Sequence, residues 1–170
     1  LIKHREVEPI PEETIGKILH LLETRLQELP AENVARRIEY LFLMKSLQGL
    51  LATPPEDDAE AQAFLLLNAA DNPVDLIPEM AVLDYQMRIA EHLKATSGEK
   101  WLEQAEEIFL YGPTRLAQWV LRDLTDNNHI GAAGHMAEQL LHRPHLNPDL
   151  FIWMVKALRE IAGIKIDTLC

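Results

Sequence analysis

The sequence has one cysteine among its 170 residues and no long apolar run. One cysteine cannot form an internal disulfide or build a cysteine-ligated zinc site. No run approaches the roughly 18 to 20 apolar residues that a membrane-spanning helix needs, and residues 1–10 lack the apolar core of a secretory signal. We therefore expect a cytoplasmic protein in a reducing compartment, without a membrane partner.

Basic residues are also scarce. The chain has 16 Lys and Arg against 27 Asp and Glu, a formal net charge of −11. Nucleic-acid surfaces typically show clustered Lys and Arg, and no such cluster occurs here. Glycine-rich phosphate loops, the dinucleotide fingerprint and the EF-hand loop are missing as well. The sequence predicts no direct nucleic-acid binding and no cofactor.

Glycine is rare, with 7 residues, and β-branched apolar residues are outnumbered. Leu, Ala and Met contribute 51 residues, against 19 Ile and Val. The first group loses little side-chain freedom in a helix, whereas Ile and Val are stiffer there and suit strands. The composition therefore predicts an all-α fold.

Most of the ten prolines fall between segments with helical apolar periodicity. Proline is tolerated at the first position of a helix and disrupts its interior. We therefore place helix starts at Pro11 and Pro78, among others, and an N-cap at Ser97. The expected helices cover roughly residues 11–29, 31–52, 56–70, 78–95, 98–111, 113–125, 129–143 and 147–162.

These seven or eight helices form one predicted domain over residues 11–162. An extended lead-in over residues 1–10 precedes it, and residues 163–170 are a C-terminal tail or the start of a missing segment. The chain begins at Leu1 rather than Met, as in a fragment or a processed protein. The last helices recur at about 17 residues, so the chain resembles a tetratricopeptide- or HEAT-like array with a repeat near 34. A short α-solenoid and a compact helical bundle both fit this spacing.

Two segments carry a second resemblance. Residues 112–121 begin with Gly112-Pro113 and include Trp119, and residues 148–153 read Pro-Asp-Leu-Phe-Ile-Trp. Together they are similar to helical extensions of some long bacterial transcript-cleavage factors. The resemblance implies a domain of a transcription-related protein whose catalytic part lies outside this chain.

Acidic residues gather where the third helix is expected to start, at Asp57, Asp58 and Glu60. The helix dipole favours acids in a first turn, which accounts for the cluster without a partner. The alternative is an acidic surface for a basic protein partner. We keep these three residues as candidate partner-binding residues.

Four of the seven histidines lie between residues 129 and 145. His135 and His142 are seven residues apart, roughly 10 Å along a helix, which is too far to share one metal ion directly. A zinc site would need another ligand, such as Glu138 or Asp126. Scattered surface histidines are the simpler interpretation, so we expect no metal. A ligand site or helical enzyme that also uses His129 is the alternative.

On the last expected helix, Ile152 and Trp153 point away from the centre of the apolar arc. Either this helix is covered on several sides, or Trp153 and Ile152 lie on a partner-binding surface, where Trp is enriched among hot spots.

A helical architecture without a convergent catalytic set predicts a non-catalytic protein-interaction or scaffolding module of a larger protein. Two alternatives stay open. One is a small helical enzyme or ligand binder near residues 129–145. The other is a regulatory domain of a transcription-related or other nucleic-acid enzyme that acts through protein contacts. The oligomeric state is left open.

Overall fold

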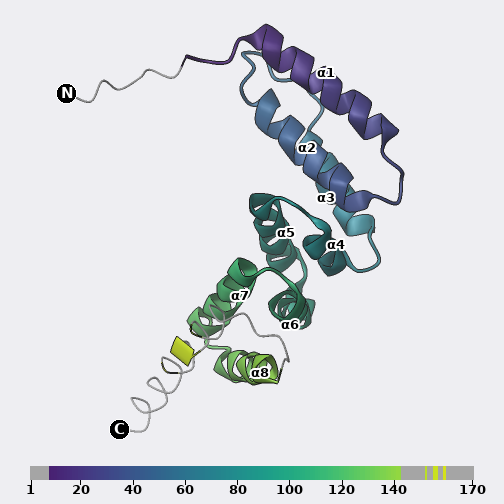
Figure 1. Cartoon of the computed structure of the whole chain (residues 1–170). Helices are drawn as coiled ribbons and strands as arrows, with labels where there is room; N and C mark the ends of the chain where they lie inside the picture. The colour runs from purple at the N-terminus through teal and green to yellow at the C-terminus, as the bar shows by residue number, and fades with distance from the viewer. Residues whose placement is uncertain (1–7, 143–151, 153–154, 157–158, 160–170) are drawn as a thin grey trace, which may run out of the picture. The chain divides into compact units, whose positions relative to one another are not determined.

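The computed structural model describes residues 8–142, 152, 155–156 and 159 (Figure 1). Over these residues it contains eight α-helices, two short 3₁₀-helices and no β-strand. The chain divides into two compact units, residues 1–76 and 77–170, and in each unit the helices pack as a bundle. The prediction of an all-α fold with seven or eight helices is confirmed for the described residues.

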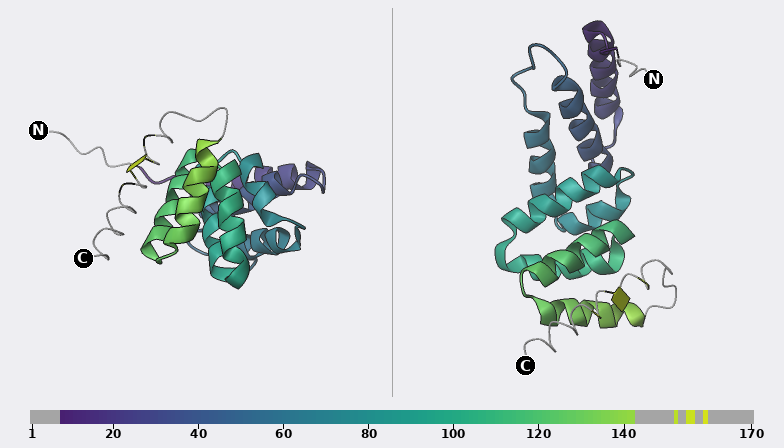
Figure 2. Two further views of the ribbon diagram at one scale, coloured as in Figure 1. Left: turned by 90° about the horizontal axis from the view of Figure 1, so that it is seen from below. Right: turned by 90° about the vertical axis from the view of Figure 1, so that its left-hand side faces the viewer.

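The first unit is a three-helix bundle of α1 (Glu12–Glu28), α2 (Val34–Gln48) and α3 (Ala59–Ala69), followed by the 3₁₀-helix η1 (Pro73–Asp75). Helix α2 lies between α1 and α3 and packs against both (Figure 2). Ile38 and Phe42 of α2 are fully buried, and Phe42 meets Phe64 of α3 edge-to-face, with ring centroids 5.6 Å apart. Apolar residues at helical spacing thus form the core of this unit.

One side chain closes the turn between α1 and α2. Arg37 donates from Nη2 to the carbonyl oxygen of Leu29 at 2.8 Å and from Nε to that of Pro30 at 3.2 Å. These carbonyls follow the end of α1, where backbone acceptors lack helical partners. The planar guanidinium therefore holds two successive carbonyls at once, a geometry that a lysine could not reproduce.

The second unit begins within α4 (Leu76–Glu79) and is centred on α6 (Trp101–Tyr111), which packs against three other helices. The partners of α6 are α5 (Leu83–Thr96), α7 (Thr114–Asp126) and α8 (Ile130–Leu141), and the 3₁₀-helix η2 (Gly98–Lys100) leads into α6. One face of α6 is buried, with Trp101, Ala105, Ile108 and Phe109 on it.

Pro78 does not start the helix predicted over residues 78–95. It lies inside the short α4, and α5 begins only at Leu83. The buried Gln86 side chain explains the break, because its Nε2 donates to the carbonyl oxygens of Ile77 at 2.9 Å and Met80 at 3.1 Å. These two carbonyl groups are satisfied without a continuous helix.

Ser97 takes the N-cap position of η2, as predicted. Its N–H donates to the carbonyl oxygen of Leu93 at 2.9 Å as α5 ends, and its side chain makes no capping hydrogen bond. The next residue, Gly98, has a φ of +55°, which glycine adopts without a steric penalty. The Ser-Gly pair therefore ends α5 and leads directly into η2.

The predicted helix over residues 147–162, the tail over 163–170 and most of the lead-in over 1–10 lie outside the described residues. A single domain over residues 11–162 stays a prediction. In the part of the chain that the structure describes, every helix is too short or too polar to cross a membrane.

Candidate functional site

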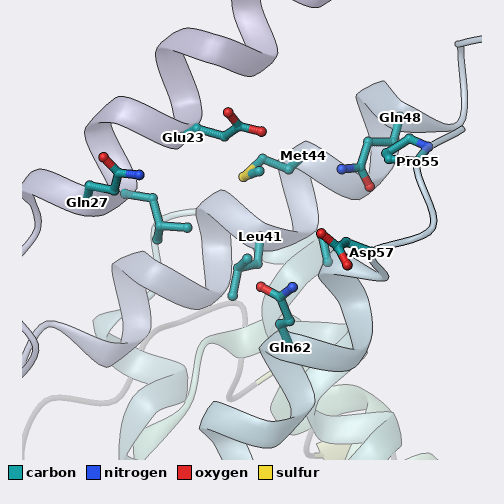
Figure 3. A pocket seen from close by; sticks show the side chains of 10 residues that line it. Glu23, Gln27, Leu41, Met44, Gln48, Pro55, Asp57 and Gln62 are labelled. Atoms are coloured by element: carbon teal, nitrogen blue, oxygen red, sulfur yellow. The ribbon is translucent and has the colours of Figure 1, made fainter.

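A hollow of about 250 Å³ opens on the three-helix unit (Figure 3). Its floor is apolar: Leu41 and Met44 of α2 are 3% and 6% exposed, and Ala59 at the start of α3 is 3% exposed. Leu26 of α1 and Pro55 of the loop before α3 complete the apolar lining. The hollow is therefore assembled from three helices and a loop of one unit.

Two carboxylates flank this floor. Glu23 reaches the hollow from α1 and Asp57 from the loop before α3 (Figure 3). Both residues are exposed, and neither takes part in an ion pair or side-chain hydrogen bond with any residue that the structure describes. Their negative charges are therefore available to a cation that enters the hollow.

Gln48, the last residue of α2, also lines the hollow (Figure 3). Its side chain is only 9% exposed, and its amide has no hydrogen-bond partner among the described residues. The polar atoms of this amide are not fully buried, so they meet solvent at the hollow. The hollow thus contains an amide that can form a hydrogen bond with a bound group.

The three residues of the predicted acidic cluster have different positions in the structure. Asp58 is the N-cap of α3: its Oδ1 accepts from the N–H of Glu60 at 3.1 Å and of Ala61 at 3.4 Å, and from Nζ of Lys45 at 3.2 Å. The hydrogen bond from Lys45, followed by that from Ala61, lowers the pKa of the Asp58 carboxyl below its ordinary value of 3.8. Among Asp57, Asp58 and Glu60, only Asp57 lines the hollow. Partner binding by these three residues stays a prediction.

The charge of the three-helix unit is one-sided. Residues 8–76 carry 13 acidic and 5 basic side chains. All five basic side chains have partners inside the unit: Lys17, Arg25, Arg36 and Lys45 form ion pairs, and Arg37 donates to backbone carbonyls. The unit therefore presents a net negative field, part of which lies at the hollow.

A second polar cluster lies in the other unit and is centred on Asp123 of α7, whose side chain is 9% exposed. Its carboxylate pairs with Lys94 of α5 and accepts from Nε1 of Trp101 at 3.4 Å and from Nδ2 of Asn127 at 3.0 Å. Lys94 also lies 5.8 Å from the ring centroid of Trp119. These contacts use the hydrogen-bonding capacity of the carboxylate to join α5, α6 and α7, which is a structural role.

The described part of the histidine region, up to His142, shows no convergent site. His129, His135, Glu138 and His142 are all exposed. In the described part of the chain, no three His, Cys, Asp or Glu side chains come close enough to hold a metal ion. This geometry gives no support to a metal site at His135, Glu138 and His142.

The C-terminal candidates are described only in part. Ile152 is 55% exposed, as its phase in the expected helix predicts. Trp153 lies outside the described residues, so partner binding by Ile152 and Trp153 stays a prediction.

The hollow was not predicted from the sequence. Its one local signal is the spacing of Leu41, Met44 and Gln48, which places an amide on the apolar stripe of α2. Glu23 looks like an ordinary solvated acid of α1. Only the packing of α1 and α3 on α2 brings Glu23, Gln48 and Asp57 to one place.

Fold and site together define an all-α helical domain with an acid-flanked hollow. The chain belongs to the family of GreA-associated C-terminal domains, whose model matches residues 9–166. This membership confirms the link to transcript-cleavage factors that the two segments predict. Comparisons with curated proteins and with solved structures gave no match.

Proposed function

We propose that this domain is a protein-interaction module of a transcription-related protein and that it regulates through protein contacts rather than by catalysis. Family membership over residues 9–166 is the observation that carries the proposal, because the family is associated with the transcript-cleavage factor GreA. We place its action in the cytoplasm, without direct contact to nucleic acid or membrane.

The surface chemistry supports a basic protein partner. The three-helix unit has 13 acidic against 5 basic side chains over residues 8–76, and its basic groups are already paired. Such a field steers a positively charged partner and disfavours the phosphate backbone of nucleic acids.

The test is a binding measurement with three immobilised targets from the organism that encodes the chain: its RNA polymerase, its GreA and a protein-free RNA–DNA transcription scaffold. We expect saturable binding of the chain to one of the two proteins and none to the scaffold, measured by biolayer interferometry. A matched transcript-cleavage assay on stalled elongation complexes then shows whether the bound chain changes the rate of cleavage.

Binding to the scaffold alone would contradict the proposal, because it would assign the contact to nucleic acid. Binding to none of the three targets would contradict it equally, since a transcription-related module must engage a component of that machinery.

A further inference from the structure

We propose that the hollow lined by Glu23, Gln48 and Asp57 binds the Lys or Arg side chain of a basic segment in the partner protein. The inference rests on the proposed function only in taking the partner to be a protein. The chemistry of the hollow itself specifies the side chain that enters.

The lining matches the two parts of a basic side chain. Lys and Arg have an apolar stem and a cationic head, and they bury the stem along apolar surface. Leu41 and Met44 offer a buried apolar floor to the stem. Glu23 of α1 and Asp57 of the loop before α3 offer two carboxylates to the head. Charge-assisted hydrogen bonds of this kind are roughly twice as strong as neutral ones.

Gln48 adds a polar acceptor to the hollow. Its side chain is 9% exposed, and its amide is open to solvent and without a hydrogen-bond partner in the described part of the chain. The Oε1 of Gln48 can accept a hydrogen bond from an ammonium or guanidinium group that also contacts the carboxylates.

Size and surroundings favour a side chain of a protein over a free ligand. The volume of about 250 Å³ is below the roughly 300–1,000 Å³ typical of pockets that bury a whole small molecule. A second hollow of about 340 Å³ shares Leu26, Leu41 and Gln62 with the first and adds Leu65, which is 69% exposed. A segment that places a basic residue in the first hollow can place an apolar residue in the second.

The test uses synthetic peptides as probes. Acetylated, amidated alanine-based decapeptides contain one Leu and one Lys, separated by one, two or three alanines. A matched set has norleucine in place of Lys, so that it keeps the stem and lacks the charge. The full chain is labelled with ¹³C at the methionine methyl groups. Of its 5 methionines, Met44 is the one within residues 1–76, and it lies in the hollow.

We expect at least one Lys peptide to shift the Met44 methyl resonance saturably, with a dissociation constant near the millimolar range. The norleucine peptides should bind at least about fivefold more weakly, since they lose the ion pairs. Glu23→Gln and Asp57→Asn should each weaken binding of the Lys peptide about fivefold. Gln48→Leu should weaken it while leaving the midpoint of thermal unfolding unchanged, because the amide has no hydrogen bond to a described residue that the substitution would remove.

Glu32→Gln is the matched control, because Glu32 is exposed and lies outside the hollow. Equal weakening by Glu32→Gln and Glu23→Gln would overturn the proposal in favour of unspecific attraction to net charge. An unmoved Met44 resonance with every peptide would overturn it as well. An equal shift with spermidine would assign the hollow to free cations.

If polymerase or GreA binds Glu23→Gln and wild type equally, the hollow proposal fails and the proposed function stands. If the peptides bind but neither protein does, the hollow proposal stands and the proposed function fails.

Discussion

Gly112 ends α6, and the chain turns there toward α7 while its backbone stays close to the last turn of α6. Its N–H donates to the carbonyl oxygen of Ile108 at 2.8 Å, and a Cβ built on it would lie 2.4 Å from that same oxygen. The obstacle is backbone, which cannot move aside as a flexible side chain does. Gly16, on an exposed turn of α1, has open space at the corresponding point.

Gly112→Ala and Gly16→Ala are therefore expected to change stability in opposite directions. The first should lower the free energy of unfolding by about 1–3 kcal/mol, because the clash forces the backbone to shift. The second should raise it by about 0.5–1 kcal/mol, because alanine favours a helix interior. Urea unfolding followed by circular dichroism measures both, and a loss of stability in Gly16→Ala would contradict the open space beside Gly16.

Asp58 makes the stability of the three-helix unit depend on pH in the acidic range. Its folded-state pKa is lowered by Lys45 below the ordinary 3.8, so its stabilising contribution is present above that value. This contribution is lost as the pH falls below 3.8 through the lowered pKa. Asp58→Asn keeps an oxygen that can cap α3 but removes the charge that pairs with Lys45.

We expect the thermal midpoint of Asp58→Asn to fall less than that of wild type between about pH 5 and pH 2. Asp57→Asn is the control, because it removes the neighbouring carboxylate, which has no ion pair with any described residue, and keeps the pair of Asp58 with Lys45. Parallel profiles for wild type and Asp58→Asn would show that the pair with Lys45 does not form in solution.

At the scale of elements, the helices of the second unit are joined by polar contacts as well as by their core. Asp123 accepts from Lys94 of α5, Trp101 of α6 and Asn127, which follows α7, and Trp101 and Trp119 meet edge-to-face at 5.8 Å beside it. Removing the carboxylate leaves the indole N–H of the buried Trp101 without its acceptor.

Asp123→Ala should therefore lower the free energy of unfolding by about 1–3 kcal/mol. It should also change the near-ultraviolet circular dichroism, since Trp101 and Trp119 lose a fixed neighbour. Asp126→Ala, at the exposed end of the same helix, should change stability by no more than about 0.5 kcal/mol. Equal losses in the two variants would refute a specific role for Asp123.

Element boundaries also show what local sequence determines. Pro11, Pro30 and Pro113 flank helices as predicted, because proline acts on its own backbone and the residue before it. Pro78 does not start a helix, because the side chain of Gln86, eight residues later, donates to the carbonyls of Ile77 and Met80 at the break. The hollow escaped prediction for the same reason. The local sequence shows only that Gln48 belongs to a helix, and the packing of α1 and α3 places it in the hollow.

At the scale of the whole molecule, the net charge of −11 at pH 7 opposes the folded state through self-repulsion. Salt screens this repulsion, with a Debye length of about 30 Å at 10 mM and 8 Å at 150 mM. Raising potassium chloride over this range at pH 7 should raise the thermal midpoint by about 2 °C or more. At pH 5, close to the sequence pI of about 5.0, the increase should vanish. A salt effect of equal size at both pH values would point to a cause other than charge.

The packing order of the helices has a consequence for how the protein reaches its native state. In both units most contacts join helices that follow one another in the chain, such as α1 with α2, α2 with α3, and α6 with α7. Chains with such local contacts close short loops and fold in microseconds to milliseconds. Ribosomes add roughly 5–20 residues per second. Each helix pair can therefore form almost as soon as it leaves the ribosome, so that its apolar faces spend little time open to aggregation.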